Sequence, residues 1–230
     1  MAMKLHRATG KHWESINASR PDTHTLHHLQ FIEAALSHRP DLVVILYVFN
    51  DIDYLSSVTP REGQSEAPKS LLDYVDPARM AFRNSYLFQE FYVRMRLMLY
   101  SAGRSNNSRY DPYADKELMA KHFKDLSLLI SRASESGAMA VVVPFEVSIN
   151  ADSNVRTRYE NFVTQGLAAG IPIWPAEHAF DGYALEQLTV NALDRHPNEF
   201  ANDLLAEAVT KQFSVVKRDL LSTSVRAQLP

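Results

Sequence analysis

Asp194 and His196 have the residue types and the spacing for hydrolytic chemistry. An aspartate two residues before a histidine can hold the imidazole in one orientation, and Pro197 then ends the loop before a helical pattern begins. Together they are the acid–histidine half of a hydrolytic triad. The alternative is an ordinary surface histidine, because the chain contains nine histidines.

Two other places offer donors for an oxyanion. Asn50 directly follows the most apolar run of the chain, where its amide can point into a cleft. The segment Asn17–Thr23 is a predicted strand–turn–helix junction, and backbone N–H groups at such a junction can bind an anion. The competing interpretations are a simple Asn50-Asp51 turn and an ordinary helix cap.

The nucleophile is harder to find. Cysteine is excluded because the chain has none, and no Gly-x-Ser-x-Gly segment is present. Ser19 follows a predicted strand and opens a helix, which makes it a weak candidate, and Ser148 is weaker. His24 and His28 share a helix face, but no carboxylate lies between them in the metalloprotease position, so a solvated face is favoured over a metal site.

The elements that must position these residues alternate between strands and helices. Apolar runs rich in β-branched residues predict strands, and a 3.6-residue apolar period predicts helices. The predicted strands are Trp13–Ala18, Asp41–Phe49, Ala138–Phe145 and Ile171–Trp174. The predicted helices are Thr23–His38, Ala78–Tyr100, Ala114–Ser136, Asn154–Ala169 and Glu199–Val216. This alternation indicates an α/β fold with a parallel sheet, whose site lies at the carboxyl ends of the strands.

Length and composition favour one domain over residues 1–230, with a loop and helix insertion at about 53–112 and a tail at 218–230 that is expected to fray. The net charge of −3 and the pI near 6.3 argue against a nucleic-acid partner. The apolar runs are too short to span a membrane. The sequence leaves the cellular compartment and the oligomeric state open.

Three segments, in this order, resemble the SGNH hydrolase superfamily, the GDSL-type esterases and lipases. Ile16–Thr25 resembles the second conserved block of that family. Pro40–Asp51, a buried strand ending in Asn-Asp, resembles the third block. Asp194–Asn198 resembles the fifth. The resemblance extends from about Trp13 to Phe213 and therefore covers most of the chain.

The resemblance implies a three-layer, flavodoxin-like α/β/α fold with a mostly parallel sheet, and acyl- or acetyl-ester hydrolysis by a Ser-His-Asp mechanism. It implies that His196 is the general base, that Asp194 orients it, and that the Asn50 amide and the backbone N–H of Asp22 line the oxyanion hole. It implies a small-molecule or carbohydrate ester as substrate, with no metal and no cofactor.

The chain departs from the family pattern in four respects. The first block, a strand ending in Gly-Asp-Ser, is not found before Trp13. Asp22 and Val48 stand where the family has glycine, and Asp194 is one residue closer to the histidine than is common. We therefore expect a truncated reading with little or no activity. The alternatives are a non-catalytic binding module for an acyl or carbohydrate ligand and a displaced nucleophile at Ser19.

Without the first family strand, the segments Trp13–Ala18 and Asp41–Phe49 have lost the strand that would separate them. They are therefore expected either to pair directly or to leave a gap in the sheet.

Overall fold

The computed structural model describes residues 1–20, 23–49, 51–52, 55, 94, 111–191 and 194–226, with side chains described as far as residue 216. The chain forms two compact units. One contains Met1–Ser56 and Pro112–Pro230, and the other contains Ser57–Asp111. The expected helix Ala78–Tyr100 lies outside the described residues, except for Arg94.

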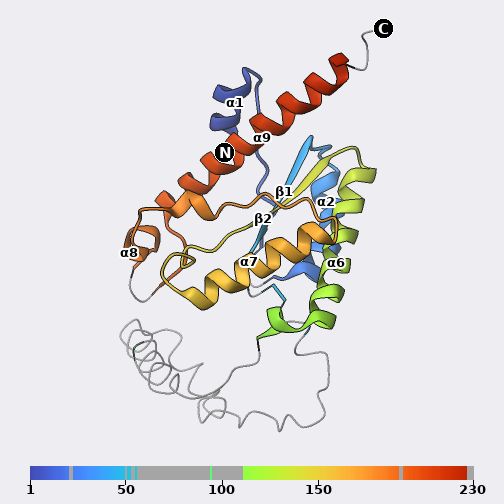
Figure 1. Cartoon of the computed structure of the whole chain (residues 1–230). Helices are drawn as coiled ribbons and strands as arrows, with labels where there is room; N and C mark the ends of the chain where they lie inside the picture. Colours follow the sequence, from blue (N-terminus) through green and yellow to red (C-terminus); the bar gives the residue numbers. More distant parts are fainter. Residues whose placement is uncertain are drawn as a thin grey trace, which may run out of the picture. The chain divides into compact units, whose positions relative to one another are not determined.

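A parallel pair of strands lies at the centre of the larger unit (Figure 1). Strand β1 (Leu42–Tyr47) pairs in parallel with β2 (Met139–Pro144), with Leu42 opposite Met139 and Tyr47 opposite Pro144. Both are short apolar runs rich in β-branched residues, as expected for buried parallel strands. On the other side of β2, Ile173 forms a single parallel bridge with Val142 at the position of the third predicted strand.

The long helices follow the predicted apolar periods, with ends that differ by a few residues, and Asp115 and Asp152 accept hydrogen bonds at the starts of two of them. Their bounds are α2 (Thr25–Leu36), α6 (Lys116–Glu135) and α7 (Ser153–Ala168). Helix α9 (Glu199–Arg226) extends ten residues beyond its predicted end at Val216. The described part of the larger unit also contains the short helical turns η2 (Pro112–Ala114), η3 (Glu177–Phe180) and α8 (Leu185–Leu188).

Alternate strand residues belong to two apolar clusters. Ile45 and Tyr47 pack with residues of α2, α6 and α7. The buried Tyr47 ring stacks on Phe162 at 4.1 Å, and its hydroxyl lies 2.6 Å from that of Tyr113. Val141 and Val143 pack instead with residues of α9 and η3. This alternation is the two-residue period of a strand that is covered on both faces.

The N-terminal region differs from the sequence prediction. Trp13–Ala18 forms no strand: Glu14–Arg20 is exposed, and among the described residues no ladder joins it to β1. The two predicted strands Trp13–Ala18 and Asp41–Phe49 were expected either to pair directly or to leave a gap in the sheet, and direct pairing is not seen. A helix that was not predicted, α1 (Ala2–Thr9), packs against α9, where Lys4 pairs with Asp203 at 3.0 Å.

Candidate functional site

The Asp194 and His196 side chains are hydrogen-bonded to each other just before α9. His196 Nδ1 lies 2.6 Å from Asp194 Oδ1, and the same oxygen accepts the His196 backbone N–H at 3.0 Å. These two hydrogen bonds hold the pKa of the Asp194 carboxyl below its usual value, the backbone N–H of His196 having the larger effect and its imidazole the smaller. A carboxylate at Nδ1 favours the tautomer whose Nε2 accepts a proton. The His196 side chain is 88% exposed and the Asp194 side chain is 47% exposed, so His196 Nε2 is open to a reactant.

Backbone hydrogen bonds close the loop that carries this pair. Thr189 and Pro197 form an antiparallel bridge, and the backbone N–H of Val190 donates to the carbonyl of His196 at 3.0 Å. The N–H of Asp194 donates to Asn191 Oδ1 at 2.8 Å. These hydrogen bonds hold residues 194–197 against residues 189–191, next to the Asp194–His196 pair.

Asn198 fastens this loop to α9. Its amide donates to the carbonyls of Gln187 and Thr189 at 2.9 and 3.0 Å, while its Oδ1 accepts the N–H of Ala201 at 3.0 Å. Oδ1 thereby caps the helix. Sequence reasoning did not give Asn198 a role, although an asparagine directly before a helical pattern is a recognised cap signal.

The other predicted site residues do not join this pair among the described residues. Asn50 and Asp22 lie outside the described ranges. Ser19 Oγ donates to Asn17 Oδ1 at 2.6 Å, and Ser148 Oγ donates to Glu146 Oε1 at 2.6 Å. Both hydroxyls are therefore held within their own loops, and no serine in the described part of the chain hydrogen-bonds to His196.

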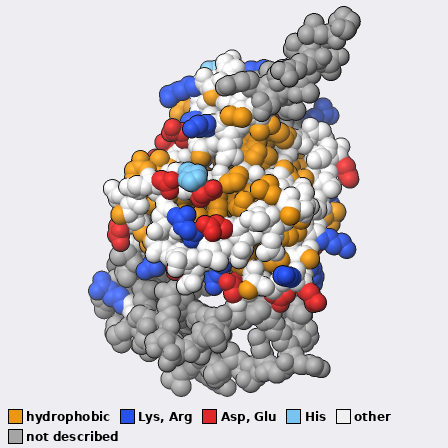
Figure 2. All heavy atoms as spheres, in the orientation of Figure 1, with side chains coloured by type: hydrophobic (Ala, Val, Ile, Leu, Met, Phe, Trp, Pro, Cys, Tyr) orange, Lys and Arg blue, Asp and Glu red, His pale blue; other side chains and the backbone are white. Residues whose placement is uncertain are grey.

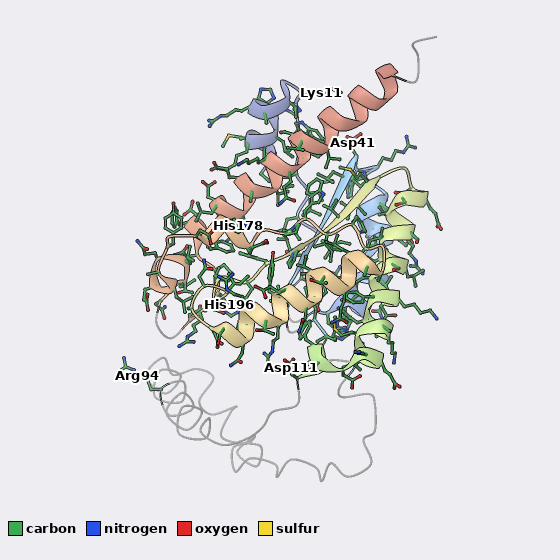
Figure 3. All side chains as sticks on the ribbon, viewed as in Figure 1. Lys11, Asp41, Arg94, Asp111, His178 and His196 are labelled. Atoms are coloured by element: carbon green, nitrogen blue, oxygen red, sulfur yellow. The ribbon has the colours of Figure 1, made fainter. Side chains whose placement is uncertain are left out.

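A second acid–histidine pair, which the sequence analysis did not single out, joins His178 and Asp181 around η3. His178 Nδ1 lies 2.9 Å from Asp181 Oδ2, and Asn150 Nδ2 donates to the other carboxylate oxygen at 3.3 Å. The hydrogen bond that Asp181 accepts from His178, followed by the charge of Glu177, raises the pKa of His178. Figure 3 shows His178 and His196 on the same side of this unit in that view. An acid three residues after a histidine was the available signal.

The histidines at the start of α2 form a packed group. The His24 and His27 rings lie 3.9 Å apart, and His28 Nε2 lies 3.3 Å from Thr23 Oγ1. Burial, followed by the neighbouring histidines, lowers the pKa of His24 and His28 and favours neutral rings. Within the described ranges, no three histidine or acidic side chains are placed to hold a metal ion.

A shallow cavity of about 240 Å³ lies at the amino ends of β1 and β2. It is lined by Lys11, His12, Trp13, Asp41, Met139, Phe213 and Val216. Phe213 is 14 residues along α9 from Glu199, which at 1.5 Å per residue is about 21 Å. The cavity is therefore far from the Asp194–His196 pair and is not its substrate pocket.

Comparisons with known proteins add no relative. No family model, no curated protein and no solved structure matches this chain. The helices of the described residues include none that combines the length and the apolar character needed to cross a bilayer.

Proposed function

We propose that this chain is an ester hydrolase of the SGNH type, in which Asp194 and His196 are the acid–base half of the catalytic group. The observation that carries the proposal is the 2.6 Å hydrogen bond between His196 Nδ1 and Asp194 Oδ1 at the entry to α9. The three sequence segments that resemble the superfamily support it. The three-layer, flavodoxin-like arrangement and the acyl- or acetyl-ester substrate are parts of the same proposal.

The chemistry follows from the two nitrogens of His196. Nε2 takes the proton of a serine hydroxyl as its oxygen attacks the ester carbonyl, and then gives that proton to the departing alkoxide. Water then attacks the acyl-enzyme. Nε2 takes a proton from this water and gives it to the serine oxygen as the acid product leaves. Asp194 accepts the hydrogen bond of Nδ1 and orients the imidazole ring. By resemblance, the Asn50 amide and the Asp22 backbone N–H stabilise the oxyanion.

The proposal includes low activity for this 230-residue chain. A serine nucleophile needs its hydroxyl on the base, whereas the hydroxyls of Ser19 and Ser148 are bonded to Asn17 and Glu146. Among the described residues no serine is aligned with His196, and turnover without an aligned serine is limited to slow attack assisted by His196. Ser19 is the alternative nucleophile.

Hydrolysis of p-nitrophenyl acetate by the purified chain, by His196→Ala and by Ser19→Ala tests these statements. We expect slow turnover that His196→Ala removes and Ser19→Ala leaves unchanged. Robust turnover would contradict the expectation of low activity for this chain. If Ser19→Ala also abolished it, the displaced-nucleophile alternative would be correct. Turnover that is unchanged in His196→Ala would contradict the role of the Asp194–His196 pair.

A non-catalytic binding module is the second candidate, favoured by the exposure of the pair, in which the His196 side chain is 88% exposed. Such a module binds an acyl or carbohydrate ligand without converting it. Calorimetry with a non-hydrolysable acyl ether and with an acetylated sugar, performed beside the turnover assay, separates the two. Saturable binding with no His196-dependent hydrolysis would favour the module.

A further inference from the structure

Strand β1 has a free edge. Because Met139 N–H donates to the Asp41 carbonyl and Phe145 N–H donates to the Tyr47 carbonyl, the odd-numbered residues of β1 face β2. The N–H and C=O groups of Leu42, Val44 and Leu46 therefore point away from β2. No other strand of the described residues pairs with them. Within the described part of the chain, this edge of β1 is therefore unpaired.

The edge also lacks the features that keep sheet edges apart. The run from Leu42 to Phe49 contains no charged residue and no proline. Leu46 is 45% exposed and Val48 is 43% exposed. Figure 2 shows apolar side chains exposed on one face of the molecule. Soluble proteins usually protect an exposed edge with lysine, proline or a bulge, and an unprotected apolar edge invites another strand.

We infer that the free edge of β1 pairs with β1 of a second copy of this chain, antiparallel and about a two-fold axis at Val44. The outward-facing residues are symmetric about Val44, so Val44 faces Val44 of the second copy and Leu42 faces Leu46 of that copy. Each of the three positions then exchanges both backbone hydrogen bonds with its opposite residue. The proposed hydrolysis does not require this pairing, although the edge is the one that the first strand of the resembled family would occupy.

Charge and side-chain direction both favour this arrangement. Asp41 lies directly before β1, and antiparallel pairing places the two Asp41 residues six positions apart, which is about 20 Å at 3.4 Å per residue. A parallel pair in register would bring these acids together. Residues that are directly opposite in an antiparallel pair lie on the same face of the sheet, so each exposed Leu46 meets an apolar Leu42. The pairing is therefore apolar over its whole length.

A single cysteine tests the position of the axis, because the chain has no cysteine of its own. Opposite residues of a hydrogen-bonded antiparallel pair have Cα atoms about 5.5 Å apart, which suits a disulfide. We expect Val44→Cys to form a cross-linked dimer under mild oxidation of the full chain. Leu128→Cys, on the exposed side of α6, is the control and should stay uncross-linked. Equal cross-linking of both variants, or none of Val44→Cys, would overturn the inference.

Sedimentation equilibrium of the unmodified chain provides the second test. Leu46→Lys and Leu128→Lys are matched, because the two leucines are 45% and 46% exposed. We expect a dimer at about 100 µM protein, with Leu46→Lys raising the dissociation constant about tenfold and Leu128→Lys leaving it unchanged. A monomeric wild-type chain at this concentration would refute the second copy as the partner. So would equal dissociation of both lysine variants.

Discussion

The contacts of Asn198 make it the residue whose loss should most disturb the Asp194–His196 loop. One side chain caps α9 through Oδ1 and holds two loop carbonyls through its amide. Asn198→Ala removes all three hydrogen bonds. Asn198→Ser keeps an oxygen that can cap the helix but has no amide to reach Gln187 and Thr189.

The expected loss of stability follows from these contacts. Removing a helix cap costs about 1 kcal/mol, and each of the two loop hydrogen bonds contributes about 1 kcal/mol. Asn198→Ala should therefore lower the free energy of unfolding by about 3 kcal/mol and Asn198→Ser by about 2 kcal/mol. For a chain of this size, 1 kcal/mol shifts the melting temperature by about 3 °C, which gives decreases of about 9 and 6 °C.

Urea and thermal unfolding followed by far-ultraviolet circular dichroism measure these differences. Asn202→Ala is the matched control, because Asn202 is exposed and its side chain donates a single hydrogen bond, to the carbonyl of Asn198 just before α9. It should change the unfolding free energy by less than about 0.5 kcal/mol. The reasoning fails if Asn198→Ser is as stable as the wild type, since the two loop hydrogen bonds would then contribute nothing.

Two further predictions concern buried polar groups. Tyr159→Phe should cost about 2 kcal/mol, because the buried N–H of Ala176 loses the phenolic oxygen that accepts it at 2.8 Å, and urea unfolding measures this loss. Burial lowers the pKa of His122 to about 3, so the folded state keeps the ring neutral while the unfolded chain binds a proton below about pH 6.5. Well above pH 6.5 this histidine therefore has no effect on stability. When the pH falls from 7.5 to 5.5, it should lower the free energy of unfolding by about 1.4 kcal/mol. His122→Leu should abolish that part of the pH dependence, and an unchanged pH profile of unfolding would contradict it.

Much of the fold could be predicted because local pattern and tertiary burial agree. The run Leu42–Tyr47 is apolar at every position, and a strand is what so short a buried run can form. Helix α6 has both a cap at Asp115 and a regular apolar stripe. Where these signals agree, the element ends were wrong by only a few residues.

Trp13–Ala18 shows why the remainder could not be predicted. The segment was predicted as a short strand, but a strand needs a partner, and no pairing partner lies beside it among the described residues. Helix α1 was missed because its stability comes from packing on α9 and from the Lys4 ion pair, which the short segment alone does not indicate.

At the candidate site, sequence spacing indicated the local contact and could not indicate its surroundings. Two residues of separation are enough to predict that Asp194 can reach His196, and the hydrogen bond is present. The hydrogen bonds from the Asn198 amide to the carbonyls of residues 187 and 189 depend on how α8 and α9 pack. The hydrogen bond from Asn150 to Asp181 connects residues that are 31 positions apart in the sequence, so it likewise depends on the tertiary fold.

The most direct measurement compares His196→Ala with His178→Ala in the hydrolysis of p-nitrophenyl acetate. Both histidines are more than 80% exposed and bonded to an aspartate, so the two variants remove chemically similar groups. If the Asp194–His196 pair is the acid–base half of an ester hydrolase, His196→Ala lowers the rate constant about tenfold or more and His178→Ala leaves it unchanged. Equal rates in the two variants would contradict the account.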